Sequence, residues 1–273
     1  KRNGVPDLRI VCEEELQRLE PNITPNALRA LWAPMCGQLA PWEAVIALAE
    51  NAVDNGVKLH LETEVREIKI KEGKVKGIQT NQGSIKSDII VNAAGIYADK
   101  ISKIVGRDHF SIHPRKGEYY IFDEDAGPKV TRIVHPTPTP QTKGVYVTTT
   151  IHGNLMIGPT SQDLTEDFKD DRSTSKKGLD FIWEWAKRLV RELPPKNKVI
   201  KTFAGLRPEP PHGDFLIEAY NELYGFINVA GMRSPGFTSA PAIAYYVKDL
   251  IKETFGVTLR EKVKWNPYRK GIL

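Results

Sequence analysis

GFINVAGMRSPGFTSAPAIAYYVKDLIKETFG, residues 225–256, is the stretch that decides the fold. Its apolar run at 226–229 predicts a buried strand. The apolar residues after the loop recur at helical spacing, which predicts a helix that stops at Gly256. A strand, a glycine-rich loop and a helix N-terminus bring free N–H groups and a positive dipole end toward an anion or a polarised ring. The same pattern also suits an ordinary strand-to-helix connection in any α/β protein.

The composition is that of a globular protein large enough for one or two domains. The chain has 273 residues, of which 40% are hydrophobic and 27% charged, and its net charge is +5. This charge suits anionic small molecules or a membrane surface as well as nucleic acid, but no RNP, zinc-finger or helix-turn-helix pattern occurs. Cys12 and Cys36 are too few for a disulfide scaffold, so we expect reduced thiols in a cytosolic protein. No apolar run approaches the roughly 20 residues that span a bilayer.

Periodicity divides the chain into α/β pieces and a strand-rich middle. The α/β pieces are expected at 41–106 and 226–256, the strand-rich part at 107–225. Within the first piece the pattern predicts a helix after Pro41, a strand at 57–61, a hairpin at 65–70 and 75–80, a strand at 85–91 and a helix at 97–105. Elsewhere it predicts a helical turn at 27–32, a long helix from Ser173 or Thr174 to Leu193, and strands at 8–11, 119–122, 130–134, 145–149, 155–157, 200–204 and 215–219. This order predicts a sheet domain inserted into an α/β domain.

Four short stretches could carry chemistry. At 89–95 a buried strand ends in small residues that allow a flat ligand to approach the backbone, although close helix–sheet packing explains them as well. Arg207 ends a strand just before Pro208 and Pro210 and could grip a carboxylate or phosphate, or could pair with Glu209 or Asp214. His152 lies between two strands, where a lone histidine is more often structural than catalytic. The fourth stretch, 63–65, indicates nothing by itself.

Five motifs in order resemble the D-amino-acid-oxidase-like FAD-dependent oxidoreductases, and most of all their glycerol-3-phosphate dehydrogenase-type members. The motifs lie at 91–99 (VNAAGIYAD), 114–119 (PRKGEY), 150–160 (TIHGNLMIGPT), 203–208 (FAGLRP) and 227–241 (INVAGMRSPGFTSAP). The resemblance covers roughly residues 8 to 270. It implies a partial Rossmann-like FAD-binding domain (41–106 and 226–256), an inserted antiparallel-sheet substrate domain (1–40 and 107–225) and a C-terminal extension (257–273).

The resemblance also implies site residues. The residues expected to contact the cofactor are Val65, Ala93, Ala94, Gly95, Gly231, Met232, Arg233, Ser234, Pro235, Gly236, Phe237 and Thr238. The helix that follows would point its N-terminus at the flavin edge that gains negative charge on reduction. Arg207 and Arg233 are expected to grip an anionic substrate and His152 to take its hydroxyl proton, while hydride passes to FAD. No metal site is expected.

One departure from the family pattern concerns the FAD pyrophosphate. The family begins with a strand, a Gly-x-Gly-x-x-Gly turn and a helix, and this chain contains no such glycine pattern. We therefore expect part of a longer flavoenzyme, or one part of a split one, that binds FAD weakly or not at all by itself.

The remaining expectations concern partners and alternatives. The electron acceptor is expected to be a quinone, oxygen or a redox protein, and the location cytoplasmic, with association with the inner membrane face left open. The alternatives are an amine or amino-acid oxidase of the same superfamily, and a non-catalytic module or subunit that needs a flavin-binding partner.

Overall fold

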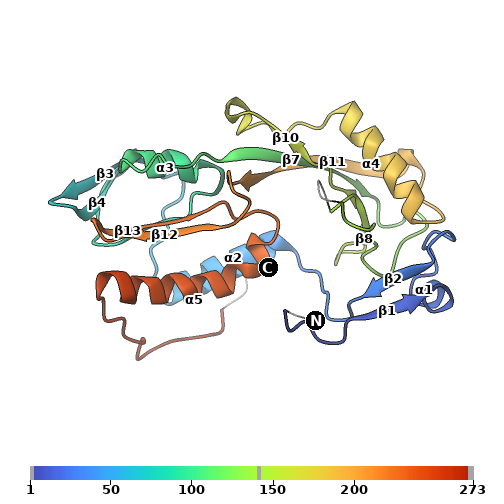
Figure 1. The fold of residues 1–273 in the computed structure, drawn as a ribbon, viewed down its shortest axis with the longest axis horizontal. Coiled ribbons are helices and arrows are strands. Elements are labelled where there is room, and N and C mark those ends of the chain that lie inside the picture. Colours follow the sequence, from blue (N-terminus) through green and yellow to red (C-terminus); the bar gives the residue numbers. More distant parts are fainter. Residues whose placement is uncertain (1–2, 140–142, 270–273) are drawn as a thin grey trace. The chain divides into compact units, whose positions relative to one another are not determined.

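A computed structural model describes residues 3–139 and 143–269 of the chain (Figure 1). The chain divides into two compact units, and each is described here by itself. Unit 1 comprises residues 1–40, 116–163 and 170–206, and unit 2 comprises residues 41–115, 164–169 and 207–273. Residues 107–115 and 207–225, which the resemblance assigned to a substrate domain, therefore belong to the same unit as 226–256. Strand pairing explains this, because the strand at 216–220 forms a hairpin with the strand at 223–230.

Unit 1 is built on antiparallel pairing. β1 (Arg9–Cys12) pairs with β2 (Arg29–Trp32), and α1 (Glu13–Leu19) connects to β1. A second sheet has the order β10-β7-β9-β8, and β11 also pairs with β7. These strands are β7 (His113–Phe122), β8 (Tyr146–Thr149), β9 (Leu155–Gly158), β10 (Gln162–Asp163) and β11 (Val199–Glu209).

Helix α4 (Lys176–Leu189) supplies the apolar layer against this sheet. Its N-cap Ser175 accepts a hydrogen bond from Gly178 N through Oγ at 3.0 Å, which satisfies one of the first-turn N–H groups. Ile182 and Ala186 lie one turn apart and are fully buried with Phe122 and Ile157 of the sheet. The helical periodicity of this stretch therefore creates the core of unit 1.

Unit 2 contains a six-stranded mixed sheet. Its order is β12-β13-β4-β3, with β5 pairing β4 and β6 pairing β13. β13 is parallel to β4 and β6 and antiparallel to β12. The strands are β3 (Val65–Lys71), β4 (Lys74–Thr80), β5 (Gly83–Lys86), β6 (Ile90–Asn92), β12 (Leu216–Tyr220) and β13 (Leu223–Ala230).

Alternation along β13 separates two helical layers. Phe226 packs toward a cluster that includes Ile101 of α3 (Ala98–Ile104), which follows the short 3₁₀ turn η1 (Gly95–Tyr97). Ile227 and Val229 belong to a different cluster, with Val247 of α5 (Gly236–Phe255). Successive side chains of a strand point to opposite faces, so a sheet with a helix on each face is formed. Figure 1 shows α3 and α5 on opposite sides of β12 and β13.

The C-terminal end of α5 agrees with the sequence pattern. Gly256 has a left-handed conformation (φ 63°) and its N–H donates to Lys252 O at 3.0 Å. The chain then continues without helix or strand through the described part of 257–273, of which residues 270–273 lie outside the described residues. Helix α2 (Pro41–Asp54) also occurs where expected, yet none of its residues is buried.

Four local predictions are wrong. Residues 27–32 contain strand β2 instead of a helical turn, because residues 29–32 pair with β1. The predicted strand at 85–91 is divided between β5 and β6 by residues 87–89. Residues 130–134 contribute only an isolated bridge between Val134 and Val147. Residues 57–61 form no strand, because no described strand pairs with them.

Candidate functional site

The carboxyl ends of β6 and β13 bring two predicted cofactor segments to one edge of the sheet. The two strands pair in parallel, with Asn92 opposite Asn228. Residues 93–95 and 231–235 therefore leave the sheet from neighbouring positions. In open α/β sheets ligands bind outside the carboxyl ends of parallel strands, so this edge of unit 2 is the candidate site.

The 231–236 loop is compact and depends on its glycines. Gly231 has φ +69°, and a Cβ there would lie 2.8 Å from Cβ of Pro210. Arg233 N donates to Gly231 O at 2.9 Å, and Gly236 N donates to Arg233 O at 2.8 Å. At Gly236 a Cβ would lie 2.8 Å from Cβ of Met232. No larger residue fits either glycine position without a shift of the loop.

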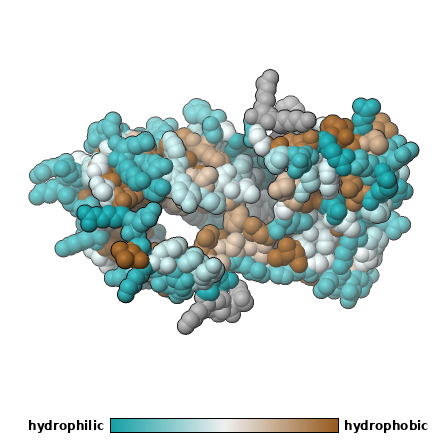
Figure 2. All heavy atoms as spheres, turned by 90° about the horizontal axis from the view of Figure 1, so that it is seen from below, coloured by the Kyte–Doolittle hydropathy of each residue, from teal (hydrophilic) through white to brown (hydrophobic). Residues whose placement is uncertain are grey.

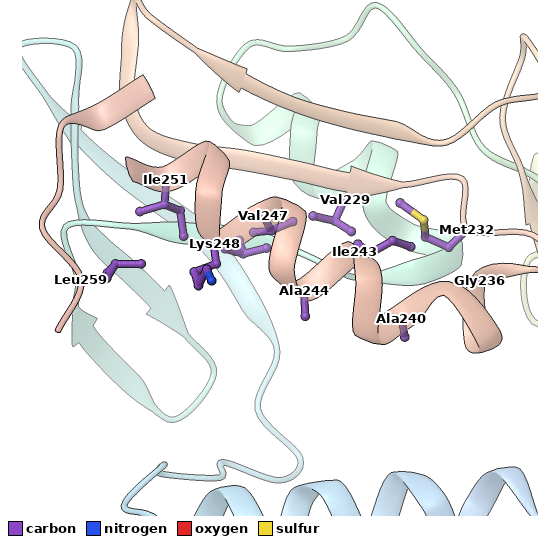
Figure 3. A pocket seen from close by; sticks show the side chains of 11 residues that line it. Val229, Met232, Gly236, Ala240, Ile243, Ala244, Val247, Lys248, Ile251 and Leu259 are labelled. Atoms are coloured by element: carbon purple, nitrogen blue, oxygen red, sulfur yellow. The ribbon is translucent and has the colours of Figure 1, made fainter. Parts of the chain in front are cut away.

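Helix α5 begins directly at the end of this loop. Pro235 is its N-cap and offers no side-chain hydrogen bond, while Ser234, Pro235, Phe237 and Thr238 are exposed. The first N–H groups of a helix have no acceptor inside the helix, and the dipole makes this end positive. Figure 3 shows Met232 and Gly236 at this end of α5. The first turn can therefore stabilise negative charge on a bound group.

The segment after β6 is open and has small side chains. Ala93, Ala94 and Gly95 are exposed, and Gly95 has φ +58° with nothing within 4 Å of a Cβ built on it. Asn92 anchors the segment, since its Oδ1 accepts from Ala94 N at 3.4 Å and its Nδ2 donates to Ala98 O at 2.8 Å. A flat ligand could approach this backbone closely.

Val65, the remaining cofactor candidate, lies at the start of β3. It is opposite Thr80, the last residue of β4. Because β4 runs parallel to β13, that end of β4 points in the same direction as the carboxyl end of β13. The topology thus directs Val65 toward the same edge as the two loops, while its contact with a cofactor stays a prediction.

Two arginines flank one buried carboxylate beside this loop. Glu209 is 5% exposed; its Oε1 lies 3.3 Å from Arg115 Nη1 and its Oε2 lies 3.5 Å from Arg233 Nη1. Arg233 Nη2 also donates to Gly213 O, whereas its buried Nε has no partner among the described residues. The cluster is positive overall and one of its guanidinium groups belongs to the loop, so it can hold an anion there.

Arg207 and His152 lie in different units. Arg207 precedes Glu209 by two residues on β11, which places both side chains on the same face of that strand. Glu209 pairs with Arg115 and Arg233, and whether Arg207 binds an anion or pairs with Glu209 or Asp214 stays a prediction. His152 is exposed in the turn between β8 and β9 of unit 1. Its role as a proton acceptor stays a prediction.

Sequence reasoning did not select Arg115 or Glu209 as site residues. Arg115 was part of the quoted 114–119 motif, and Glu209 was considered only as an ion-pair partner. The sequence did offer one signal for these two site residues, because each is a charged residue near a strand end. Arg115 lies near the start of β7, and Glu209 is the last residue of β11. Sequence spacing could not show that these ends meet, because the two residues are far apart along the chain.

Neither a metal centre nor a membrane-spanning helix is found in the part of the chain that the structure describes. No group of three or more His, Cys, Asp or Glu residues there could hold a metal ion. None of the described helices is both long enough and apolar enough to cross a bilayer.

Known proteins are similar to this chain in both sequence and fold. The family model DAO, FAD dependent oxidoreductase, matches residues 1–250. Glycerol 3-phosphate dehydrogenase of Caloramator mitchellensis is 44% identical over 271 residues, which are 99% of this chain and 55% of that protein. Glycerol 3-phosphate oxidase of Mycoplasma pneumoniae is 30% identical over 267 residues, covering 96% of this chain and 68% of that protein. The chain thus spans little more than half of the Caloramator relative.

The dithionite-reduced L-alpha-glycerophosphate oxidase of Mycoplasma pneumoniae with FAD bound has a similar structure. The TM-score is 0.83 at 30% identity, and the match covers 96% of this chain and 68% of that chain. Glycine oxidase of Bacillus cereus has a TM-score of 0.81 at 22% identity, a likeness of fold alone. The expected fold class, a Rossmann-like piece with an antiparallel sheet, is confirmed by the first of these matches.

Proposed function

Because the chain belongs to the FAD dependent oxidoreductase family, we propose that it forms the ring-binding and substrate-binding part of a flavin-dependent enzyme. Its substrate is glycerol 3-phosphate or a similar small anionic 2-hydroxy compound. The observation that carries this proposal is the 44% identity to a glycerol 3-phosphate dehydrogenase over 99% of the chain. The arginines at the carboxyl edge of unit 2 supply the chemical reason for an anionic substrate.

The residues at this edge fit the flavin ring of FAD. Small exposed side chains at 93–95 and the exposed Ser234 and Pro235 of the 231–236 loop leave backbone accessible to a flat group. The first turn of α5 offers a positive dipole end, which suits a ring whose charge becomes more negative on reduction. Residues 231–238 would lie beside the ring, Ala93, Ala94 and Gly95 along the cofactor, and Val65 near the adenine.

The cofactor supplies the two-electron acceptor for the oxidation of the substrate alcohol to a carbonyl. The protein's own contribution is position and charge. Arg233 would bind the phosphate or carboxylate of the substrate, with Arg207 of β11 as a second ligand. Glu209 would hold Arg233 in place, since its carboxylate lies between Arg233 and Arg115. A fixed guanidinium loses less conformational entropy when the anion binds.

For the electron acceptor, the proposal names only a class of molecule. Oxygen, a quinone or a redox protein can each reoxidise a reduced flavin. The Mycoplasma pneumoniae relative carries the name oxidase and the Caloramator relative the name dehydrogenase. We propose that this protein passes its electrons on as a dehydrogenase, in line with the higher identity to the Caloramator relative.

A chimera tests the function without depending on the FAD affinity of the isolated chain. Residues of this chain replace the matched 271-residue region of the Caloramator mitchellensis protein. Anaerobic addition of glycerol 3-phosphate should bleach the flavin absorption band, whereas glycerol, which lacks the anion, should act far more weakly.

The same measurement with glycine, sarcosine and proline separates the proposal from an amine or amino-acid oxidase. Bleaching by one of these amino acids and not by glycerol 3-phosphate would overturn the proposed substrate. The unmodified Caloramator protein serves as the control that the assay works.

A further inference from the structure

The positive charge of the chain is concentrated in one stretch of unit 1. Residues 176–201 form α4, the 3₁₀ turn η3 (Lys196–Lys198) and the start of β11. They contain eight lysines and arginines and three acidic residues, which gives a net charge of +5. The whole chain also carries +5, so the remainder of the chain is neutral in sum. Charge of one sign on a short stretch creates a local positive potential that attracts an anionic partner.

The acidic residues of α4 are already paired, and several of the cations are not. Asp180 Oδ1 lies 3.5 Å from Lys196 Nζ, and Glu184 Oε2 lies 3.0 Å from Lys187 Nζ. Four exposed cations of this stretch have no ion-pair partner among the residues that the structure describes. They are Lys176, Lys177, Arg188 and Lys198. The excess charge is therefore available to a partner outside the chain.

Aromatic side chains lie among these cations. Phe181 of α4 is 47% exposed, and its ring centroid lies 6.0 Å from that of Trp185. Arg188 Cζ lies 4.9 Å from the centroid of the Trp185 ring, and Lys196 Nζ lies 4.9 Å from that of Trp183. Aromatic rings next to lysine and arginine on an amphipathic helix are typical of helices that lie at the interface between lipid headgroups and acyl chains.

Apolar exposure alone does not distinguish α4 from other parts of the surface. Figure 2 shows brown side chains gathered in patches on the face that it displays, and Leu28 and Met35 are 72% and 68% exposed outside α4. Such patches would bind a neutral surface and an anionic surface alike. The stretch at 176–201 differs because exposed aromatic rings and excess cations occur together there. Its partner must therefore offer both negative charge and an apolar interior.

We propose that the outward face of α4, together with η3, binds the surface of a membrane that contains anionic lipids. Phe181 and Trp185 lie at the level of the headgroups, and the lysines and arginines contact the lipid phosphates. The helix lies in the plane of the surface and does not cross the bilayer, because it has 14 residues where roughly 20 are needed. The inference concerns a surface of unit 1 and is independent of the proposed substrate.

An acidic protein would match the charge but fits the composition of this face less well. Six of the eight basic residues in 176–201 are lysines. Lysine is depleted in interfaces between proteins, whereas the polar faces of helices that lie on membranes are rich in lysine and arginine. We therefore expect lipid phosphates to be the anions that this face binds.

The test is cosedimentation of the 273-residue chain with lipid vesicles. One set of vesicles contains phosphatidylcholine alone, and in the other about a third of the lipid is phosphatidylglycerol. The affinity for the anionic vesicles should be at least about tenfold higher, because only they complement the positive charge. Added salt should release the protein from them, since it screens exposed charges.

Substitutions locate the binding on α4. The double variant Lys176→Glu, Lys177→Glu should weaken binding to the anionic vesicles at least about tenfold. Glutamate in the first turn suits the helix dipole, so α4 should stay folded, which circular dichroism checks. The matched control is Lys71→Glu, Lys86→Glu, which changes the net charge equally at exposed positions of β3 and β5 and should bind as before.

A second variant tests the aromatic contact. Phe181→Ala keeps every charge and should weaken binding to the anionic vesicles about threefold or more, because it removes the exposed ring that enters the headgroup layer. Leu28→Ala, which removes an exposed apolar side chain outside α4, is its control and should leave binding unchanged.

Three results would overturn the proposal. One is equal binding to neutral and anionic vesicles, and another is equal loss in the two double variants, which would reduce the effect to net charge. The third is the absence of vesicle binding together with retention on immobilised polyglutamate that Lys176→Glu, Lys177→Glu abolishes. That result would assign this face to an acidic protein.

Discussion

Asn92 and Asn228 join the ends of two parallel strands through their side chains. Asn92 Nδ2 donates to Asn228 Oδ1 at 2.8 Å, and both residues are buried, at 3% and 0% exposed. Asn228 Nδ2 donates in turn to Ser102 Oγ and to the hydroxyl of Tyr220, each at 2.9 Å. Burial, together with the hydrogen bond to Glu218, raises the pKa of Tyr220, so this hydroxyl stays protonated. The network fixes the point from which both loops of the candidate site leave the sheet.

Asn228→Ala should therefore destabilise unit 2 and loosen the site. It removes the donor to Ser102 Oγ and leaves Asn92 Nδ2 only its bond to Ala98 O, at about 1–3 kcal/mol. Urea unfolding should report the loss, and hydrogen exchange at 93–95 should accelerate. Asn197→Ala, at an exposed position, is the control and should change stability by less than about 0.5 kcal/mol. An unchanged exchange rate at 93–95 would show that the amide pair does not hold this segment.

Lys169→Met should be strongly destabilising. Lys169 Nζ lies 2.6 Å from Oδ2 and 2.9 Å from Oδ1 of Asp99, and the two side chains are 3% and 1% exposed. Without the ammonium the buried carboxylate loses its counter-charge, which costs about 3–5 kcal/mol. The double variant Asp99→Asn, Lys169→Met should recover part of the loss in urea unfolding.

The exposed ion pair of Lys187 with Glu184, at 3.0 Å, offers the matched control. Lys187→Met should cost at most about 1 kcal/mol. Similar losses for the two lysine substitutions would contradict a special role of the buried pair.

Acid stability of unit 1 should depend on Asp171. The hydrogen bond from Lys116 Nζ at 2.8 Å, followed by those from Ser173, holds the pKa of Asp171 well below its ordinary value of 3.8. A depressed folded pKa means that the unfolded chain binds the proton more readily. The stabilising contribution is thus complete above about pH 4 and disappears as the pH falls from 3.8 through the lower folded value.

Asp171→Asn should accordingly be less stable than the parent at pH 7, with a difference that shrinks below pH 3. Thermal unfolding from pH 7 to pH 2 measures both curves. Asp108→Asn, at an exposed carboxylate, is the control and should leave the curve unchanged. Parallel curves for Asp171→Asn and the parent over the whole range would contradict the prediction.

Substitutions in the arginine cluster should affect substrate binding in the chimera. Arg207→Ala and Arg233→Ala should each raise KM for glycerol 3-phosphate about 10- to 100-fold, because each removes a charged hydrogen-bonding group from an anion. Glu209→Gln should raise KM less, since the amide can still accept a hydrogen bond from Arg233 but no longer carries charge.

Steady-state kinetics with glycerol 3-phosphate and uncharged glycerol checks this, because a binding role predicts loss only for the anionic substrate. Arg66→Ala, whose side chain is 63% exposed on β3, is the control. An unchanged KM in Arg207→Ala would remove Arg207 from the site.

Sequence patterns predicted the elements whose formation depends on residues close together in the chain. Helix α2 after Pro41, the strand at 226–229 and the stop at Gly256 each follow from periodicity or from a left-handed glycine. β2 was missed because Arg29–Trp32 alternates only weakly and becomes a strand through its partner β1. The opposite error occurred at 57–61, where the pattern is that of a strand but no described strand lies beside it.

The site was predictable only in part for the same reason. The glycines and small residues at 93–95 and 231–236 signal close backbone approach by their type alone. The grouping of Arg115, Glu209 and Arg233 depends on the pairing of distant segments, and so does the ion pair between Asp99 and Lys169. Such contacts are set by topology, which no short stretch of sequence contains.

The pairing of β13 with β6 also determines how long β6 stays unpaired while the chain is synthesised. Ile90 pairs with Phe226, 136 residues later in the chain (226 − 90). At ribosomal rates of about 5–20 residues per second, β6 waits roughly 7–27 s for its neighbour to emerge. During that interval the nascent polypeptide presents Ile90 and Val91 without a sheet around them. Rare codons or a pause before residue 226 would lengthen this exposure and raise the demand for chaperones.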